Sequence, residues 1–131
     1  YFKDRHPDHE RCARMVKEAV FYAGLKKYPA QGEAHKTKQI FYYFGNNETE
    51  PSFVHDISMM MPEKLEVLKA YKSQFFENGN IQRAQTPINQ PDFFEWVEAR
   101  AKFYGKRAGF RFGEPFISEQ LIGIQNITSI L

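Results

Sequence analysis

Residues 39–44 read Gln39-Ile40-Phe41-Tyr42-Tyr43-Phe44, and Gly45-Asn46-Asn47 follows them directly. β-Branched and aromatic side chains favour strands, and a run without polar alternation is typical of a strand that is buried on both faces. Glycine and asparagine are turn residues, so they are expected to end the strand. The sequence therefore predicts a buried strand here, and the segments on either side have to supply the layers that cover it.

The segment before this strand has the periodicity of an amphipathic helix over residues 7–27. Pro7 suits a first helical turn, and Asp8 and Glu10 complement the positive end of the helix dipole. The predicted inward face consists of apolar residues at helical spacing: Cys12, Met15, Val16, Ala19, Val20 and Ala23.

The segments after the strand are predicted to form a second strand over residues 52–57, a helix over 62–76 and another over 92–107. Ser58 is the candidate cap of the first of these helices, and Gly109 is placed to end the second. Residues 78–91 form a polar loop, and the tail from 110 to 131 is apolar but irregular.

This order of elements predicts an α/β chain with an incomplete sheet, and we expect the apolar face of the helix over residues 7–27 to pack on a parallel sheet. Two short strands are a poor sheet, because three or more strands are normally needed for independent stability. The chain begins at Tyr1 without an initiator methionine, and ionisable residues crowd its first ten positions. We therefore expect further strands of the same domain upstream, with residues 1–131 as its C-terminal part.

Composition and charge exclude several classes of protein. The 131 residues contain 18 Lys and Arg against 16 Asp and Glu, and the basic residues are spread along the chain, which does not predict nucleic-acid binding. No apolar stretch approaches the about 20 residues of a membrane helix. Cys12 is the single cysteine, which excludes an internal disulfide and favours the cytoplasm.

The candidate chemistry lies in Arg5-His6-Pro7-Asp8-His9, at the start of the first predicted helix. His9 precedes Cys12 by three residues, so it is expected at the edge of the inward face, and His6 can approach the same place from the preceding loop. The Asp8 carboxylate is expected to accept a hydrogen bond from a ring N–H of His6. By spacing alone, a helix cap with solvated histidines is the more common interpretation, since one or two ligands do not make a zinc site.

The run Asp4-Arg5-His6-Pro7-Asp8-His9 resembles the second signature of the LmbE-like, or GlcNAc-phosphatidylinositol de-N-acetylase, superfamily. Later segments of the chain, as far as Gly113-Glu114-Pro115-Phe116, resemble the downstream blocks of this family in the same order. Within the family, the chain resembles the bacillithiol-biosynthesis deacetylases in particular. The intermediate blocks are His35-Lys36, Val54-His55-Asp56-Ile57, Lys64 to Ser73-Gln74, and Glu98-Ala99-Arg100 with Gly105 and Gly109.

The resemblance implies a Rossmann-like, three-layer deacetylase that binds zinc, with Fe(II) or Mn as alternative metals. Its metal is held by a His and an Asp of an upstream His-Pro-Asp-Asp motif and by the final histidine of the second signature, which corresponds to His9. His6 corresponds to the histidine that stabilises the oxyanion, and Asp8 to the aspartate that orients it. Lys36 stands near the place of a basic residue that contacts the substrate, although Thr37 replaces the expected proline.

The chain contains no His-Pro-Asp-Asp motif, so two metal ligands and the general base are absent from it. The resemblance implies that the whole protein removes the N-acetyl group of an N-acetylglucosamine conjugate, with N-acetylglucosaminyl malate as the expected substrate. We expect this segment to be inactive unless the missing N-terminal half complements it. The alternative is a non-catalytic binding or assembly segment that contributes contacts to a homo-oligomer through the loop at 78–91 and the tail.

Overall fold

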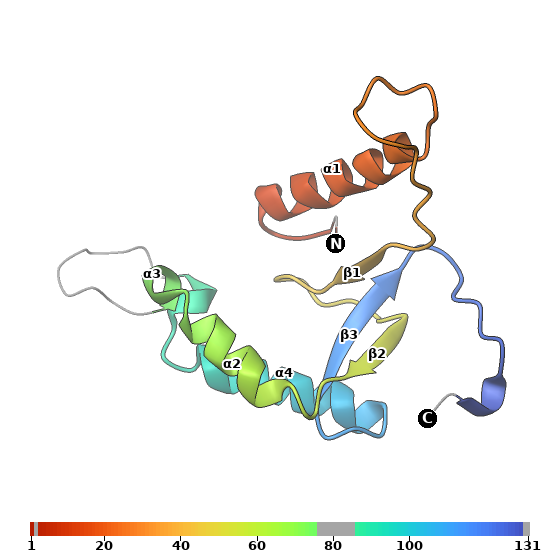
Figure 1. The fold of residues 1–131 in the computed structure, drawn as a ribbon. Helices are drawn as coiled ribbons and strands as arrows, with labels where there is room; N and C mark the ends of the chain where they lie inside the picture. The colour runs from red at the N-terminus through yellow and green to blue at the C-terminus, as the bar shows by residue number, and fades with distance from the viewer. Residues whose placement is uncertain (2, 76–85, 130–131) are drawn as a thin grey trace. The chain divides into compact units, whose positions relative to one another are not determined.

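The computed structural model describes residues 1, 3–75 and 86–129. The chain divides into two compact units, of which the first comprises Tyr1–Phe53 and Pro115–Leu131 and the second comprises Val54–Glu114. Three strands form one sheet in the order β1-β3-β2. These elements confirm the predicted α/β class with an incomplete sheet (Figure 1).

The first unit contains helix α1 (Pro7–Ala23), strand β1 (Phe41–Tyr43), most of strand β3 (Gly113–Ser118) and the short 3₁₀ helix η2 (Ile127–Ser129). Strands β1 and β3 are antiparallel, and Tyr42 is paired with Ile117. The sequence-based expectation of a parallel sheet is therefore wrong for this part of the domain. The buried character of residues 39–44 is common in parallel sheets, but it does not determine strand direction.

Strand β3 corrects the prediction of an irregular tail. Gly113–Ser118 is the central strand of the sheet, with alternating buried and half-buried residues. Glycine and proline both disfavour strand interiors, so Gly113 and Pro115 conceal the alternation of this segment. The Ser52 N–H donates to the Phe116 carbonyl at 2.8 Å. This bond pairs β3, next to Pro115, with the segment that precedes β2.

Strand β1 exposes one of the two faces that were predicted to be buried. Tyr42 and Phe44 are each 6% exposed, whereas Tyr43 is 66% exposed. Helix α1 differs from its prediction in the same way, because Met15 is 63% exposed and Cys12 is exposed as well. The apolar pattern of these elements predicts a surface suited to packing, but it does not identify what covers that surface.

The second unit contains most of strand β2 (Phe53–Asp56) and helices α2 (Met61–Lys69), α3 (Lys72–Phe75) and α4 (Phe93–Arg107). The helix predicted over 62–76 is interrupted between α2 and α3. Of the predicted loop, positions 78–85 lie outside the described residues, and the 3₁₀ helix η1 (Pro87–Asn89) follows them. The core consists of Ile57, Met61, Ala101 and Phe112, with Leu65 and Val97 packed against it.

Ser58 does not cap helix α2, whose N-cap is Met60. Its hydroxyl donates instead to the Asp56 carboxylate at 2.5 Å and accepts from the Phe112 N–H at 3.1 Å. Ser58 therefore fixes the chain after β2, while the helix begins at Met61, with Pro62 in its first turn and no side-chain cap.

Helix α4 and the start of β3 are in contact through two glycines. A Cβ atom on Gly105 would lie 2.8 Å from the backbone of Phe112 and Gly113, and a Cβ on Gly113 would lie 2.9 Å from the backbone of Gly105. Both residues are buried. Because the opposing atoms belong to the main chain, they cannot rotate away as a flexible side chain would.

We predict that Gly105→Ala destabilises the second unit, although alanine is the better helix former by about 1 kcal/mol. Steric overlap with the main chain should cost more than this gain, with a net loss of about 1–3 kcal/mol in the free energy of unfolding. Urea denaturation measures the change.

Ala99→Gly on the exposed side of the same helix is the matched control, and it should show only the loss of helix propensity. An equal or more stable Gly105→Ala protein would contradict the close contact between α4 and β3.

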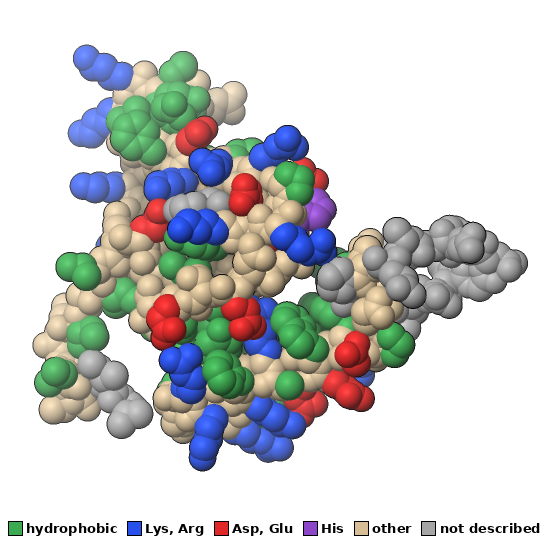
Figure 2. Space-filling view, turned by 180° about the vertical axis from the view of Figure 1, so that it is seen from behind, with side chains coloured by type: hydrophobic (Ala, Val, Ile, Leu, Met, Phe, Trp, Pro, Cys, Tyr) green, Lys and Arg blue, Asp and Glu red, His purple; other side chains and the backbone are tan. Residues whose placement is uncertain are grey.

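No helix in the described part of the chain has the length and hydrophobicity needed to span a bilayer. On the face drawn in Figure 2, acidic side chains lie among the basic ones, and hydrophobic side chains also reach the surface. The large hydrophobic residues that are exposed include Phe21 at 65% and Met15 at 63%.

Candidate functional site

The candidate site lies at the start of helix α1, where His6 is the N-cap residue and Pro7 the first helical residue. His6 has the extended backbone typical of a cap, with φ of −91° and ψ of 119°. Its ring Nδ1 accepts a hydrogen bond from the Asp8 N–H at 3.2 Å. An imidazole here replaces the usual serine or aspartate, so the same side chain ends the loop and starts the helix.

The structure brings the rings of His6 and His9 together. Their centroids are 4.8 Å apart and their planes are tilted by 27°, so the two rings are stacked. Both side chains are accessible, with 47% of His6 and 52% of His9 exposed. The expectation that both histidines lie at one place agrees with this geometry, whereas the expectation that His9 points into the core does not.

The expected hydrogen bond between the His6 ring and the Asp8 carboxylate is not formed. The nearest atoms, His6 Nδ1 and Asp8 Oδ2, are 4.0 Å apart, because the backbone N–H of Asp8 already occupies that ring nitrogen. The Asp8 carboxylate is 72% exposed and lies 3.4 Å from Arg11 Nη1. The Asp8 carboxylate therefore lies near the His6 ring without a direct hydrogen bond to it.

Asp4 is the residue that the sequence analysis did not single out, and it lies at the centre of the site. Only 3% of its side chain is exposed. Its Oδ1 accepts from the His6 N–H at 2.8 Å and from Asn46 Nδ2 at 2.9 Å, and its Oδ2 accepts from the Asn46 N–H at 2.7 Å. His9 Nδ1 lies 3.1 Å from the same Oδ1.

The environment of Asp4 keeps its carboxylate ionised. Burial raises the pKa of this group. The opposing effects together are larger: the pKa is lowered by hydrogen bonds from the Asn46 side chain and from the backbone N–H groups of His6 and Asn46, and by the nearby His9 ring. The net effect is a pKa well below the ordinary value for aspartate. Asp4 is thus a buried anion whose carboxylate oxygens accept hydrogen bonds from His6 and from Asn46.

The sequence contains one indication of this cluster before the first helix and another after the first strand. Asp4 stands two residues before the helix cap, the spacing at which an aspartate accepts from a backbone N–H, and Asn46 lies in the turn after the strand. Neither residue type is unusual at its position. Only the tertiary structure places Asn46 beside Asp4, 42 residues away.

Gly45 makes room for the Asp4 carboxylate. A Cβ atom at this position would overlap Asp4 Oδ2, and it would lie 3.2 Å from Asp4 Cγ and 3.5 Å from His9 Nδ1. The glycine after strand β1 is therefore required by the close approach of a side chain, in addition to its place in a turn.

We predict that Gly45→Ala displaces the Asp4 carboxylate and breaks its hydrogen bond to the Asn46 N–H. Loss of hydrogen bonds to a charged group costs about 1.5–3 kcal/mol. Amide hydrogen exchange of Asn46 should therefore be faster by at least tenfold in the variant.

Gly123→Ala is the control, because a Cβ at Gly123 meets no atom within 4 Å. Unchanged exchange at Asn46 in the Gly45→Ala protein would show that the carboxylate does not occupy the position described here.

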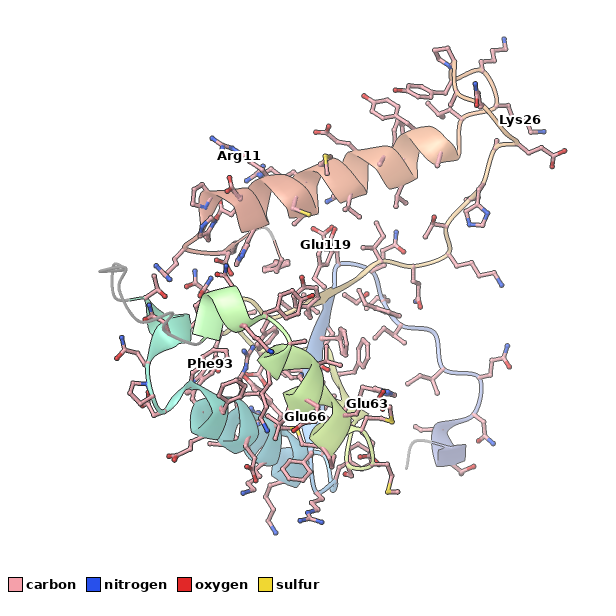
Figure 3. All side chains as sticks on the ribbon, turned by 60° about the vertical axis from the view of Figure 1, so that its left-hand side comes forward. Arg11, Lys26, Glu63, Glu66, Phe93 and Glu119 are labelled. Carbon is pink, nitrogen blue, oxygen red and sulfur yellow. The ribbon has the colours of Figure 1, made fainter. Side chains whose placement is uncertain are left out.

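The structure does not place Lys36 near His9. The His35 N–H donates to the Ala23 carbonyl at the far end of α1, so Lys36 follows that end of the helix. A rise of about 1.5 Å per residue separates His9 from Ala23 by about 21 Å. Figure 3 shows Arg11 near the start of α1 and Lys26 beyond its other end, which illustrates this separation.

The remaining histidines and the cysteine do not join the site. His35 and His55 are exposed, and His55 lies on strand β2, as expected for a surface-facing residue. Within residues 1, 3–75 and 86–129, no group of three or more His, Cys, Asp and Glu side chains is arranged to hold a metal ion. His9 is thus a candidate for one ligand of a site that this part of the chain does not complete.

Comparison with known proteins gives the site a family context. No family model matches the chain. Diacetylchitobiose deacetylase of Thermococcus kodakarensis is 27% identical over 114 residues, an alignment that covers 83% of this chain and 38% of that protein.

Two solved structures have a similar fold. The conserved protein TT1542 of Thermus thermophilus has a TM-score of 0.79 and 31% identity, and the match covers 95% of this chain and 51% of that one. The N,N'-diacetylchitobiose deacetylase of Pyrococcus horikoshii, solved with its inhibitor MPG, has a TM-score of 0.64 and 24% identity. That match covers 88% of this chain and 41% of the deacetylase, and at this identity it shows the fold alone.

The chain thus spans between 38% and 51% of the length of these three proteins. The described elements match a fragment of their fold, which confirms that the sheet is incomplete. The sequence match to a deacetylase and the structural matches agree with the signature in residues 4–9. These matches support the resemblance of the chain to the LmbE-like superfamily.

Proposed function

We propose that this chain carries one side of the active site of a zinc-dependent deacetylase that hydrolyses the N-acetyl group of an N-acetylglucosamine conjugate. The observation that supports this proposal most strongly is the environment of His9. One ring nitrogen faces a buried carboxylate, while more than half of the side chain remains accessible. The homologous enzyme of Thermococcus kodakarensis is named a diacetylchitobiose deacetylase, which supports the same class of reaction.

The donor atoms of the site suit a metal of the zinc type. An imidazole whose second nitrogen is held by a carboxylate is the usual form of a zinc-binding histidine. His9 Nε2 has no hydrogen-bond partner among the residues that the structure describes. We propose His9 as one ligand, and a segment that carries a His-Pro-Asp-Asp motif as the source of the other two. Fe(II) and Mn also accept imidazole and carboxylate ligands.

Zinc, when bound, supplies a Lewis acid that polarises the amide carbonyl. The protein's own contribution in this chain is His6. Its Nδ1 accepts the Asp8 N–H, so in the neutral ring Nε2 carries the hydrogen and can donate to the carbonyl oxygen as negative charge grows there. The Asp8 carboxylate, 4.0 Å away, stabilises any positive charge that the ring acquires.

The reaction breaks the amide C–N bond. Water supplies a hydroxyl group to the acetyl carbon and a hydrogen to the nitrogen, so acetate and a free amino sugar are released. A general base is needed to take the first proton from water, and we assign it to the complementary segment. The proposed centre in this chain consists of His6, Asp8 and His9, without Lys36.

We propose N-acetylglucosaminyl malate, the bacillithiol precursor, as the substrate, on the strength of the sequence resemblance in residues 4–9 and the later blocks. We place the reaction in the cytoplasm, because the single free thiol at Cys12 agrees with a reducing compartment. Acetate release from this compound, compared with release from N,N'-diacetylchitobiose, tests the assignment. Faster hydrolysis of N,N'-diacetylchitobiose would contradict the assignment and indicate a substrate like the one in the homologue's name.

The exposed apolar face of α1 supports the need for a complementary segment. Met15, Val16, Phe21 and Tyr22 are each at least 41% exposed. A helix face of this kind normally packs against another element. We propose that the N-terminal half of the domain covers it, and that the assembled domain forms a homo-oligomer.

The same face is also what the alternative function requires, namely a non-catalytic segment that binds or assembles through apolar contacts. A protein in which residues 1–131 are joined to an N-terminal half with the His-Pro-Asp-Asp motif distinguishes the two functions. Acetate release from an N-acetylated amino sugar supports the deacetylase. A folded, zinc-free and inactive joined protein supports the assembly role.

We predict that His9→Ala in the joined protein lowers both zinc content and deacetylase activity, because His9 supplies one of the three ligands of the proposed site. Activity should fall by at least a hundredfold, and zinc measured by atomic emission should fall below stoichiometric amounts.

His35→Ala is the matched control and should leave both quantities unchanged, since His35 is exposed and follows the far end of α1. Full zinc content in the His9→Ala protein would show that His9 is not a ligand.

A further inference from the structure

The carboxylate of Asp4 and the ring of His9 form a pair whose geometry determines which nitrogen of His9 is available. Asp4 Oδ1 lies 3.1 Å from His9 Nδ1, and the Asp4 side chain is 3% exposed against 52% for His9. We propose that Asp4 is a positioning residue for His9. It holds the hydrogen on Nδ1 and thereby keeps Nε2 unprotonated and directed outward for a metal. This inference rests on the proposed function, and it adds a residue to it.

The hydrogen has to be on Nδ1 because an ionised carboxylate only accepts hydrogen bonds. With a bare Nδ1, a ring lone pair would face a lone pair of the buried Asp4 carboxylate at 3.1 Å, which is repulsive. Asn46 offers a competing arrangement, since its Nδ2 lies 3.3 Å from His9 Nδ1 and could donate to it. The shorter contact and the full charge of the carboxylate favour donation from His9 to Asp4.

Asn46 serves the pair in another way. Its Nδ2 donates to Asp4 Oδ1 at 2.9 Å, and its backbone N–H donates to Oδ2 at 2.7 Å. With the His6 N–H at 2.8 Å, these donors fix both carboxylate oxygens. The orientation of the His9 ring is therefore set by a carboxylate that is itself held by two segments of the chain.

Asp4 also has a structural role that has to be separated from this one. It accepts the backbone N–H two residues further on, as Asp56 does from the Ser58 N–H at 2.9 Å. A purely structural Asp4 would order the helix start but would have no effect on the protonation site of His9. The test must therefore read the ring directly.

The experiment is ¹⁵N NMR of histidine-labelled chain 1–131 without metal, at a pH where the rings are neutral. The wild-type His9 is expected to be mainly in the Nδ1–H tautomer. Asp4→Asn keeps the size of the side chain, but its amide can turn an NH₂ group toward His9, so the Nε2–H form should become the major one. The rings of His35 and His55, both exposed, should be unchanged.

Asp56→Asn is the matched control, because it removes a similar backbone cap in the other unit and should leave the His9 tautomer as it is. A wild-type His9 in the Nε2–H form would overturn the proposal without any variant. Equal tautomer populations in wild type and a folded Asp4→Asn protein, as judged from the amide spectrum, would overturn it too.

A second measurement in the joined protein connects the tautomer to the metal. Competition with a chelator should show Zn²⁺ affinity about 10–100-fold lower for Asp4→Asn than for wild type. Equal affinities would overturn the positioning role but leave the deacetylase proposal intact. Absence of Zn²⁺ binding by the wild type, with His9 still in the Nδ1–H form, would overturn the deacetylase proposal alone, while Asp4 would remain the residue that fixes the ring.

Discussion

The burial of one ionised carboxylate, that of Asp4, is the constraint on which the candidate site depends. A buried charge is costly unless donors surround it, and Asp4 has three donors from His6 and Asn46 in addition to the His9 ring. Those donors come from the start of α1 and from the turn after β1. Satisfying the charge therefore joins two segments that are far apart in the sequence. Gly45 is part of the same constraint, because any side chain there would occupy the space of the carboxylate.

The two histidines of the signature are held in different ways, and this difference agrees with different roles. His6 is fixed at Nδ1 by a backbone donor, whereas His9 faces a carboxylate at the same ring atom. One ring is thereby suited to donate from Nε2, and the other to offer Nε2 as a ligand. The rings are stacked and accessible, so a substrate and a metal could meet beside them.

Local sequence patterns predicted α1, α4 and β2 well, because periodicity and Pro or Gly signals mark such elements directly. They failed for β3, where Gly113 and Pro115 obscure the alternation, and for strand direction, which depends on contacts between distant segments. The signature in residues 4–9 identified His6 and His9, and the structure places the two rings together. It assigned the orienting carboxylate to Asp8, which is close in sequence. The carboxylate that contacts a ring directly is that of Asp4, which faces His9, and its partner Asn46 is 42 residues away, a separation that no local pattern encodes.

In the proposed site, His9 binds a metal through Nε2 while Asp4 holds Nδ1. A crystal structure of residues 1–131 joined to an N-terminal half with the His-Pro-Asp-Asp motif, grown with zinc, tests it most directly through the anomalous signal of the metal. We expect a zinc peak about 2.0–2.1 Å from His9 Nε2, with the Asp4 carboxylate still in contact with Nδ1. Zinc bound to Nδ1, or bound at a place that does not include His9, would contradict it.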